Sequence, residues 1–193
     1  MKHGVILVSL PLAWDKRTYP KNPTYYTEFD NVDIAFVGGY WIYKGQQLDR
    51  YLKPYARNLT VYGYTKWPYG NYGGILPVER EGSLYSQAKI CPVINEPHVE
   101  LMGIDQNERV FKVLGSGGFA ITDPVPGYRE WFSEYELLVP KDENQFHELV
   151  HLAWRDRDFN YQYRKNGQRA VIERHSYMHR AVETLHRLGI HFG

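Results

Sequence analysis

The chain contains 193 residues, of which 43% are hydrophobic and 23% are charged, as expected of a globular protein with a single core. Its 23 basic and 22 acidic residues give a formal net charge of +1, which argues against nucleic acid or an anionic membrane surface as a partner. The single cysteine, Cys91, excludes an internal disulfide bond and fits the reducing environment of the cytoplasm, where we expect the protein to reside.

The N-terminal region begins with a short apolar run, Val5 to Leu10, that predicts a strand. This run is too short for a signal peptide or a membrane-spanning helix. From Pro11 to Pro23 the chain contains three prolines and many polar residues, which predict a linker or an extended strap rather than part of the core. We therefore divide the chain into an N-terminal segment, residues 1–23, and one folded domain, residues 24–193.

Further short apolar runs predict buried strands, because most of them are almost continuously apolar. They are Ile34–Val37, Leu59–Tyr62, Ile90–Ile94, Phe119–Thr122 and Glu136–Val139. Amphipathic or polar segments separate these runs from one another. This alternation predicts an α/β fold, in which helices cover both faces of a parallel sheet.

Apolar residues recur at helical spacing in three of the intervening segments. The first runs from Lys44 to about Ala56 and presents one apolar stripe to the sheet. The second begins after Asp142, which forms a capping pair with Gln145. The third is the last helix of the chain, which Ser176 caps and Gly189 ends.

A Gly-, Pro- and Tyr-rich segment from Gly63 to Gly82 predicts a long ordered loop, and loops of that length are often functional. Aromatic residues make up 16% of the chain and crowd between Tyr40 and Tyr72. Such crowding is typical of a surface that stacks a sugar or a base, and equally of ordinary packing at the edge of a core. We favour ordinary packing.

The first candidate for chemistry is the pair Gly38-Gly39, which follows a predicted strand and leads into the helix that carries Lys44. Glycines let the backbone approach a phosphate, and the start of a helix offers N–H donors and positive potential. The glycine spacing of a dinucleotide-binding fingerprint is absent. A plain turn between strand and helix therefore remains an alternative.

The second candidate is a predicted helix from about Glu108 to Leu114, whose start offers Arg109 to a phosphate. The pair Gly117-Gly118 closes the turn from this helix into a buried strand. Glu108 lies one helical turn before Lys112, so an exposed ion pair of about 0.3 to 0.5 kcal/mol explains both side chains without a ligand.

Two stretches of sequence carry a family resemblance. The run from Arg109 to Asp123, followed by Pro126 to Phe132, resembles the C-terminal domain of group-1-type glycosyltransferases, in particular the branch named after the spore-maturation protein CgeB. The ending His175 to Arg180 is similar to the closing motif of that branch. The resemblance extends over nearly the whole chain from about Leu10, and it implies one Rossmann-like half of a GT-B fold.

The resemblance also implies a function. In a GT-B enzyme the C-terminal domain binds the nucleotide-sugar donor, and the N-terminal domain carries most of the acceptor site and often the catalytic base. We therefore expect a glycosyltransferase-like protein that acts as the donor-binding half, with a separate acceptor-domain protein or a homodimer mate as partner and with neither a metal nor another cofactor. The alternative is a non-catalytic nucleotide-binding or scaffold module that retains only the fold.

The resemblance implies roles for particular residues. Gly38, Gly39 and Lys44 would lie near the diphosphate and Arg109 would contact a phosphate, whereas Asn95, Glu96 and His98 would border the base and the ribose. The full set of expected nucleotide-binding residues is Gly38, Gly39, Lys44, Asn95, His98, Glu108, Arg109, Lys112, Gly117 and Gly118.

Two residues depart from the family pattern. Many relatives have a glutamate at the position of Lys112 that holds the ribose hydroxyls, and a lysine cannot accept those hydrogen bonds. Many also have an arginine at the position of Gly39. Glu108 is the nearest carboxylate that could take the ribose role. The identity of the donor, and catalysis itself, therefore stay open.

Other reactive side chains have weaker patterns. His175 and His179 are one helical turn apart but lack the further ligands of a metal site, so we expect structural roles for them. Cys91 has no evident partner base, and we expect it to be a buried apolar residue.

Overall fold

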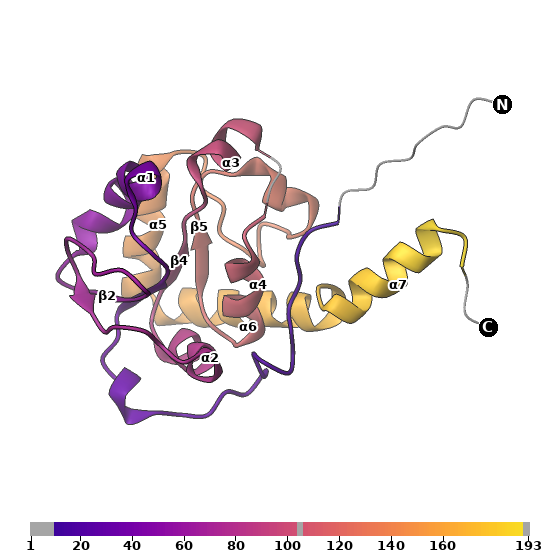
Figure 1. The fold of residues 1–193 in the computed structure, drawn as a ribbon, viewed down its shortest axis with the longest axis horizontal. Coiled ribbons are helices and arrows are strands. Elements are labelled where there is room, and N and C mark those ends of the chain that lie inside the picture. The colour runs from indigo at the N-terminus through magenta and orange to yellow at the C-terminus, as the bar shows by residue number, and fades with distance from the viewer. Residues whose placement is uncertain (1–9, 104–105, 191–193) are drawn as a thin grey trace.

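A computed structural model describes residues 10–103 and 106–190 of the chain (Figure 1). Its strands are β1 (Ile34–Val37), β2 (Leu59–Tyr62), β3 (Asn71–Tyr72), β4 (Cys91–Val93) and β5 (Ala120–Thr122). Its helices are α1 (Ile42–Leu52), α2 (Val78–Gln87), α3 (Pro97–Met102), α4 (Glu108–Gly115), α5 (Glu143–Arg155), α6 (Arg157–Arg174) and α7 (Tyr177–Arg187). Short 3-10 turns cover Thr27–Phe29, Lys53–Tyr55 and Pro126–Glu130.

All strand pairs in the described residues are parallel. β1 lies between β2 and β4, with Ile34 opposite Leu59 in β2 and joined to Ile90 by a parallel bridge. β3 pairs with the outer side of β2, and β5 pairs with the outer side of β4. The spatial order β3-β2-β1-β4-β5 is that of a Rossmann-like sheet. The predicted α/β fold with a parallel sheet is confirmed.

Helices cover both faces of this sheet (Figure 1). On one face α2 and α4 pack over the sheet, with the middle of α6 beside α4, and they contribute Leu84, Phe111 and Val171 to one apolar core. On the other face α1 and α5 contribute Leu48 and Phe146 to a second core. Strands with a helix layer on each side are buried on both faces, which explains their nearly continuous apolar sequences.

The predicted caps are confirmed. The Asp142 side chain accepts a hydrogen bond from the Gln145 backbone N–H at 2.9 Å at the start of α5. Ser176 caps α7, and the His179 ring accepts the Ser176 backbone N–H in return at 3.1 Å. Gly189, with φ +75°, follows the end of α7 in the left-handed conformation that glycine adopts easily.

The strap from Pro11 to Pro23 is irregular, as predicted, but the prediction that it stays out of the core is wrong for two aromatic residues. Trp14 and Tyr19 are both buried, and the Trp14 indole N–H donates to the Tyr19 carbonyl oxygen at 2.6 Å. The polar neighbours of each ring hid this burial in the sequence. Of the predicted strand Val5–Leu10, only Leu10 lies within the described residues, and it is in no strand.

Other element boundaries also differ from the predictions. The expected loop from Gly63 to Gly82 contains β3, and its end belongs to α2. The expected strand Glu136–Val139 is reduced to a single bridge, in which Leu138 pairs with Ile121 of β5. α6 was missed because, of its 18 residues, only Gly167, Ala170 and Val171 are buried, so it has no broad apolar stripe.

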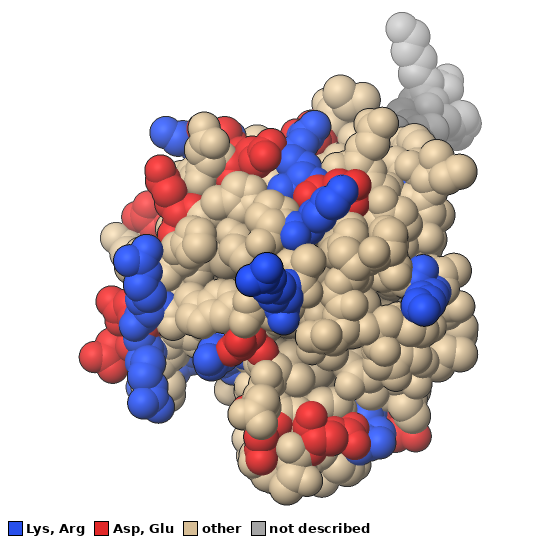
Figure 2. All heavy atoms as spheres, turned by 90° about the vertical axis from the view of Figure 1, so that its left-hand side faces the viewer, with Lys and Arg blue, Asp and Glu red and all other residues tan. Residues whose placement is uncertain are grey.

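The surface charge is mixed, in keeping with the net charge of +1. Figure 2 shows Lys and Arg side chains interspersed with Asp and Glu on the left-hand side of the molecule in Figure 1. Within the described residues, no helix combines the length and the apolar character that crossing a membrane requires.

Candidate functional site

The carboxyl ends of β1, β4 and β5 meet at one edge of the sheet. Gly38 follows β1, Asn95 follows β4 after one residue, and Asp123 follows β5 directly. α1 and α4 begin at the same edge. In open parallel sheets this is the edge where ligands bind, because helix starts and strand ends converge there.

Asp123 organises this edge from inside the protein. Its carboxylate, fully buried, accepts hydrogen bonds from the Asn95 backbone N–H at 3.1 Å and from the Gln47 side chain at 3.0 Å. The Asn95 side-chain amide also donates to it, and the Asn95 carbonyl accepts from the Tyr128 hydroxyl at 3.1 Å. Burial raises the pKa of Asp123, and the hydrogen bonds from Asn95 and Gln47 act in the opposite direction. The Asn95 side chain is thus engaged within the protein at both ends.

Lys44 places a buried cation at the same edge. It lies in the first turn of α1, is only 3% exposed, and its Nζ contacts Glu96 Oε1 at 3.0 Å. Burial is the main cause that lowers the pKa of Lys44, and the positive charge of Arg109 adds to the effect. Two cations therefore lie near each other, and one carboxylate contacts the first of them.

Arg109 is the second cation, at the start of α4. Asn107 caps this helix by accepting the Arg109 backbone N–H at 3.0 Å. The guanidinium lies over the Phe36 ring, with Cζ 4.5 Å from the ring centre. Its Nη1 atom is buried and has no hydrogen-bond partner among the residues that the structure describes. A buried guanidinium nitrogen without an acceptor is costly, so this atom indicates a missing anion.

Gly38 and Gly39 serve steric roles in this arrangement. A Cβ atom on Gly38 would lie 2.8 Å from the Phe36 ring and 3.0 Å from Arg109 Nη2. A Cβ atom on Gly39 would lie 2.3 Å from the Trp41 ring. The Gly38 N–H donates to the Tyr62 carbonyl at 2.8 Å, so it is engaged within the sheet. The glycine at position 38 therefore makes room for the Arg109 guanidinium.

A pocket of about 200 Å³ lies beside Arg109, between α2 and α4. It is lined by Val37, Glu81, Tyr85, Asn107, Glu108, Arg109 and Lys112. Within it, Lys112 Nζ contacts Glu108 Oε2 at 2.8 Å and lies 5.0 Å from the centre of the Tyr19 ring. The ion pair expected from the sequence is therefore present, and both of its members line the pocket. Glu81 was missed because the predicted loop covered the first half of α2, and Tyr85 because no helix was predicted over the second half.

The remaining candidates are His98, Gly117 and Gly118. His98 is exposed in the first turn of α3, two residues after Glu96. Gly117 and Gly118 connect the end of α4 to the start of β5, so they lie at the opposite edge of the sheet. Gly117 has φ +80°, and a Cβ atom on Gly118 would lie 2.6 Å from the Tyr85 carbonyl oxygen. The structure does not bring these two glycines together with Arg109 and Lys44.

Three of the aromatic residues that follow β1 pack against one another rather than forming an open platform. The Tyr40, Trp67 and Tyr69 rings meet edge to face, with centres 5.5 to 6.0 Å apart. Trp67 is buried, and its indole N–H donates to the Gly38 carbonyl oxygen at 3.0 Å. The favoured interpretation, ordinary packing, is confirmed for these three rings.

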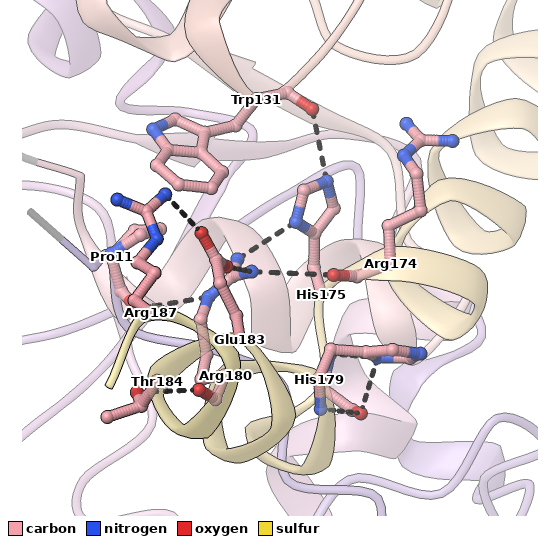
Figure 3. Close-up of polar contacts among 10 residues, drawn as sticks. Pro11, Trp131, Arg174, His175, His179, Arg180, Glu183, Thr184 and Arg187 are labelled. Atoms are coloured by element: carbon pink, nitrogen blue, oxygen red, sulfur yellow. Dashed lines mark hydrogen bonds and ion pairs between the residues drawn. The ribbon is translucent and has the colours of Figure 1, made fainter. Parts of the chain in front are cut away.

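The histidine pair has structural contacts (Figure 3). His175 Nε2 lies 3.0 Å from the Trp131 carbonyl oxygen and its Nδ1 lies 2.9 Å from Arg180 Nη2, while His179 bonds to Ser176. In the part of the chain that the structure describes, no group of three or more His, Cys, Asp or Glu side chains is arranged to hold a metal. Cys91 is buried, and burial raises its pKa to about 12, as expected of an unreactive thiol.

Comparison with protein families gives one match. The family described as "Glycosyl transferase-like" matches residues 46–186. No curated protein sequence matches the chain.

Solved structures show where the same fold occurs. Sucrose-phosphate synthase from Thermosynechococcus elongatus is similar with a TM-score of 0.67 and 15% identity, over 92% of this chain and 51% of that one. An α-glucosyltransferase in complex with UDP and DNA gives 0.60 and 9% identity, over 90% and 58%. The C-terminal CMP-Kdo binding domain of WaaA from Acinetobacter baumannii gives 0.51 and 12%, over 74% and 91%. The chain thus spans about half the length of the synthase, and these identities establish the fold alone.

Proposed function

Because the chain belongs to the glycosyl transferase-like family and has the fold of one half of a GT-B glycosyltransferase, we propose that it binds a nucleotide-activated sugar through its diphosphate. The observation that carries this proposal is the buried Nη1 atom of Arg109, which lacks an acceptor at the start of α4. A guanidinium binds phosphate oxygens in a bidentate manner, and the N-terminus of a helix favours the same negative charge.

The electrostatics of the edge support an anion at this place. The positive charge of Arg109 lowers the pKa of Lys44, so the two cations repel each other in the free protein. A diphosphate between them would replace this repulsion with two attractions. Glu96 contacts Lys44 but is partly exposed, and it can move aside when a stronger anion arrives.

We further propose that the protein acts as the donor-binding half of a glycosyltransferase of the CgeB-like branch. Arg109 and Lys44 would stabilise the negative charge that develops on the leaving diphosphate. Two of the similar structures are described with UDP or as CMP-Kdo binding, which fits a donor of this class. The acceptor would be held by a separate acceptor-domain protein or a homodimer mate, since orientation of the acceptor supplies much of the rate.

A second candidate function is a binding module without transfer activity. The observation that favours it is Lys112, which stands where many relatives have a ribose-binding glutamate and which pairs with Glu108. The two functions are separated by activity, since both include nucleotide binding. A module without transfer would bind nucleoside diphosphates and leave nucleotide-sugars intact in the presence of any acceptor domain.

The proposal is tested by thermal shift and calorimetry with UDP, GDP, CDP, TDP and their sugars. At least one should bind the natural protein, and Arg109→Ala should weaken that binding by about 2 to 3 kcal/mol because a charged hydrogen bond is lost. Lys53→Ala is the control, since it removes a cation that is 62% exposed just after the end of α1, away from the start of α4. Equal affinity in the Arg109 variant and the control would disprove the diphosphate site.

A further inference from the structure

We propose that Glu81 of α2 accepts hydrogen bonds from the ribose hydroxyls of the bound nucleotide, so that the pocket beside Arg109 selects ribonucleotides over deoxyribonucleotides. This inference rests on the proposed diphosphate site. Glu81 lies on α2, whereas the sequence placed the expected ribose contact on α4.

The position of the pocket supports this assignment. Its volume of about 200 Å³ suits one sugar ring, and Arg109 forms part of its wall. The ribose of a nucleotide is joined to the phosphate that Arg109 would hold, so its ring must lie close to the guanidinium. The pocket meets this requirement, because Arg109 and Glu81 both line it.

Two carboxylates line the pocket, and one of them has an oxygen without a partner in the described residues. A ribose hydroxyl is best recognised by a carboxylate oxygen, and Lys112 has only donors. Each oxygen of Glu108 already has a partner, because Oε2 contacts Lys112 at 2.8 Å and Oε1 accepts from the Tyr177 hydroxyl at 3.1 Å. Glu81 uses only Oε2, which accepts from the Tyr19 hydroxyl at 2.8 Å. Within the described part of the chain Glu81 has no ion pair, so its Oε1 is free to accept.

The strap fixes the direction of the Glu81 carboxylate. Tyr19 is buried, its backbone N–H donates to the Asp15 carbonyl at 2.9 Å, and its own carbonyl accepts from the Trp14 indole. Burial, together with the negative charge of Glu81, raises the pKa of the Tyr19 hydroxyl well above its usual value. The phenol therefore remains a donor, and it holds Oε2 so that Oε1 stays available to the ligand. In this arrangement Tyr19 is a positioning residue for Glu81.

The test compares UDP, GDP and CDP with their 2′-deoxy and 3′-deoxy counterparts by calorimetry. For the nucleotide that binds best, the natural protein should prefer the ribose form by about tenfold. Glu81→Ala should reduce this preference to less than about twofold. Glu79→Ala is the matched control: it removes the same charge from an exposed position of the same helix, and it should keep the preference.

Each outcome decides one of the two proposals. If Glu81→Ala keeps the tenfold preference while still binding the diphosphate, the ribose assignment is overturned and the diphosphate site stands. If none of the nucleotides binds the natural protein, the proposed function fails and the assignment fails with it. If Glu81→Ala does not fold, Tyr19→Phe releases the carboxylate without removing it. That variant should lower the preference to about threefold, and an unchanged preference would count against the assignment.

Discussion

Two arginines of the described residues, Arg180 and Arg109, differ in how their donors are used. Arg180 of α7 donates to the carbonyl oxygens of Pro11 and Arg174 and to His175 Nδ1, at 3.3, 3.4 and 2.9 Å, and it stacks on Trp131 (Figure 3). Arg109 of α4 also stacks on an aromatic ring, but its buried Nη1 lacks an acceptor in the described residues.

This difference separates an arginine whose donors are satisfied by the fold from one that we propose to bind a ligand. The acceptors of Arg180 come from the strap, from the end of α6 and from the residue between α6 and α7, so one side chain joins three segments. Proteins satisfy buried donors in this way when the group stabilises the fold. A cation that the fold leaves unsatisfied is stable only if something outside the fold completes it. The comparison predicts that substitution of Arg180 lowers stability much more than substitution of Arg109.

The largest expected effect is on stability. Arg180→Ala should lower the free energy of unfolding by about 2 to 4 kcal/mol, because it leaves partly buried carbonyl groups and a buried histidine nitrogen unpaired. Arg109→Ala should change the unfolding free energy by less than about 1 kcal/mol, since the repulsion from Lys44 is removed along with the stacking. Urea denaturation measures both, with Arg187→Ala on the exposed face of α7 as control. A similar loss for Arg109 and Arg180 would break the comparison.

The second prediction concerns His175, a partner of Arg180, and the dependence of stability on pH. Burial, with the positive charges of Arg180 and Arg174, lowers the pKa of His175 to about 4, whereas an unfolded histidine titrates near 6.5. Between these values the unfolded state binds more protons, so stability is complete above about pH 6.5 and is lost as the pH falls towards 4. The full loss amounts to about 3 kcal/mol.

Chemical denaturation between pH 4 and 7 measures this dependence. Burial also lowers the pKa of His147, which acts in the same direction, so the experiment is done with His147→Gln in every protein. Adding His175→Gln should flatten the remaining slope in the window from pH 4 to 6.5. An unchanged slope would show that His175 is not the group that titrates.

The third prediction concerns Lys44, the cation near Arg109, and its contribution to nucleotide affinity. Lys44→Ala should weaken diphosphate binding by about 1 to 3 kcal/mol if its ammonium exchanges Glu96 for a phosphate. The removal also frees Glu96, whose charge then repels the ligand. Calorimetry with Lys44→Ala and with the double variant Lys44→Ala, Glu96→Gln separates the two terms. If the single variant binds as the natural protein does, Lys44 belongs with Arg180 among the structural cations.

The sequence predicted that the Gly38-Gly39 turn and the start of the helix that carries Arg109 meet at one edge of the sheet, because both placements follow from local rules. A strand that ends in Gly38 and a helix that begins before Arg109 must share an edge in a parallel sheet, and that placement is what the structure has. Gly117 and Gly118 lie away from that edge for the same kind of reason. These glycines stand at the end of α4, and helix ends in this topology lie at the opposite edge.

Other contacts were beyond local rules. Glu81 was missed because Gly82 and Ser83 beside it are poor helix formers, so local propensity does not predict a helix there. The α2 helix is stabilised instead by apolar packing against the rest of the fold. Tyr19 meets Glu81 across 62 residues and Arg180 meets Pro11 across 169, and no periodic pattern encodes such pairs. The sequence did single out His175, but its partners Arg180 and Trp131 belong to two other segments.

The smallest predicted effect concerns Lys112, where the family pattern and this chain differ. Lys112 pairs with Glu108, so in the proposed site Lys112→Glu removes no phosphate contact and adds an acceptor to the pocket. Repulsion between the two carboxylates one turn apart should cost about 0.3 to 0.5 kcal/mol of stability. Ribonucleotide binding should become tighter by about 1 kcal/mol and deoxyribonucleotide binding should not, since the gain comes from the ribose hydroxyls.

Calorimetry with each nucleotide pair checks this, and Lys112→Gln controls for the lost ion pair. If Lys112→Glu instead weakens all nucleotides, Lys112 serves the diphosphate. If no nucleotide distinguishes it from the natural protein, the pocket lies outside the nucleotide site, and Arg109 would need another anion to explain its unsatisfied nitrogen.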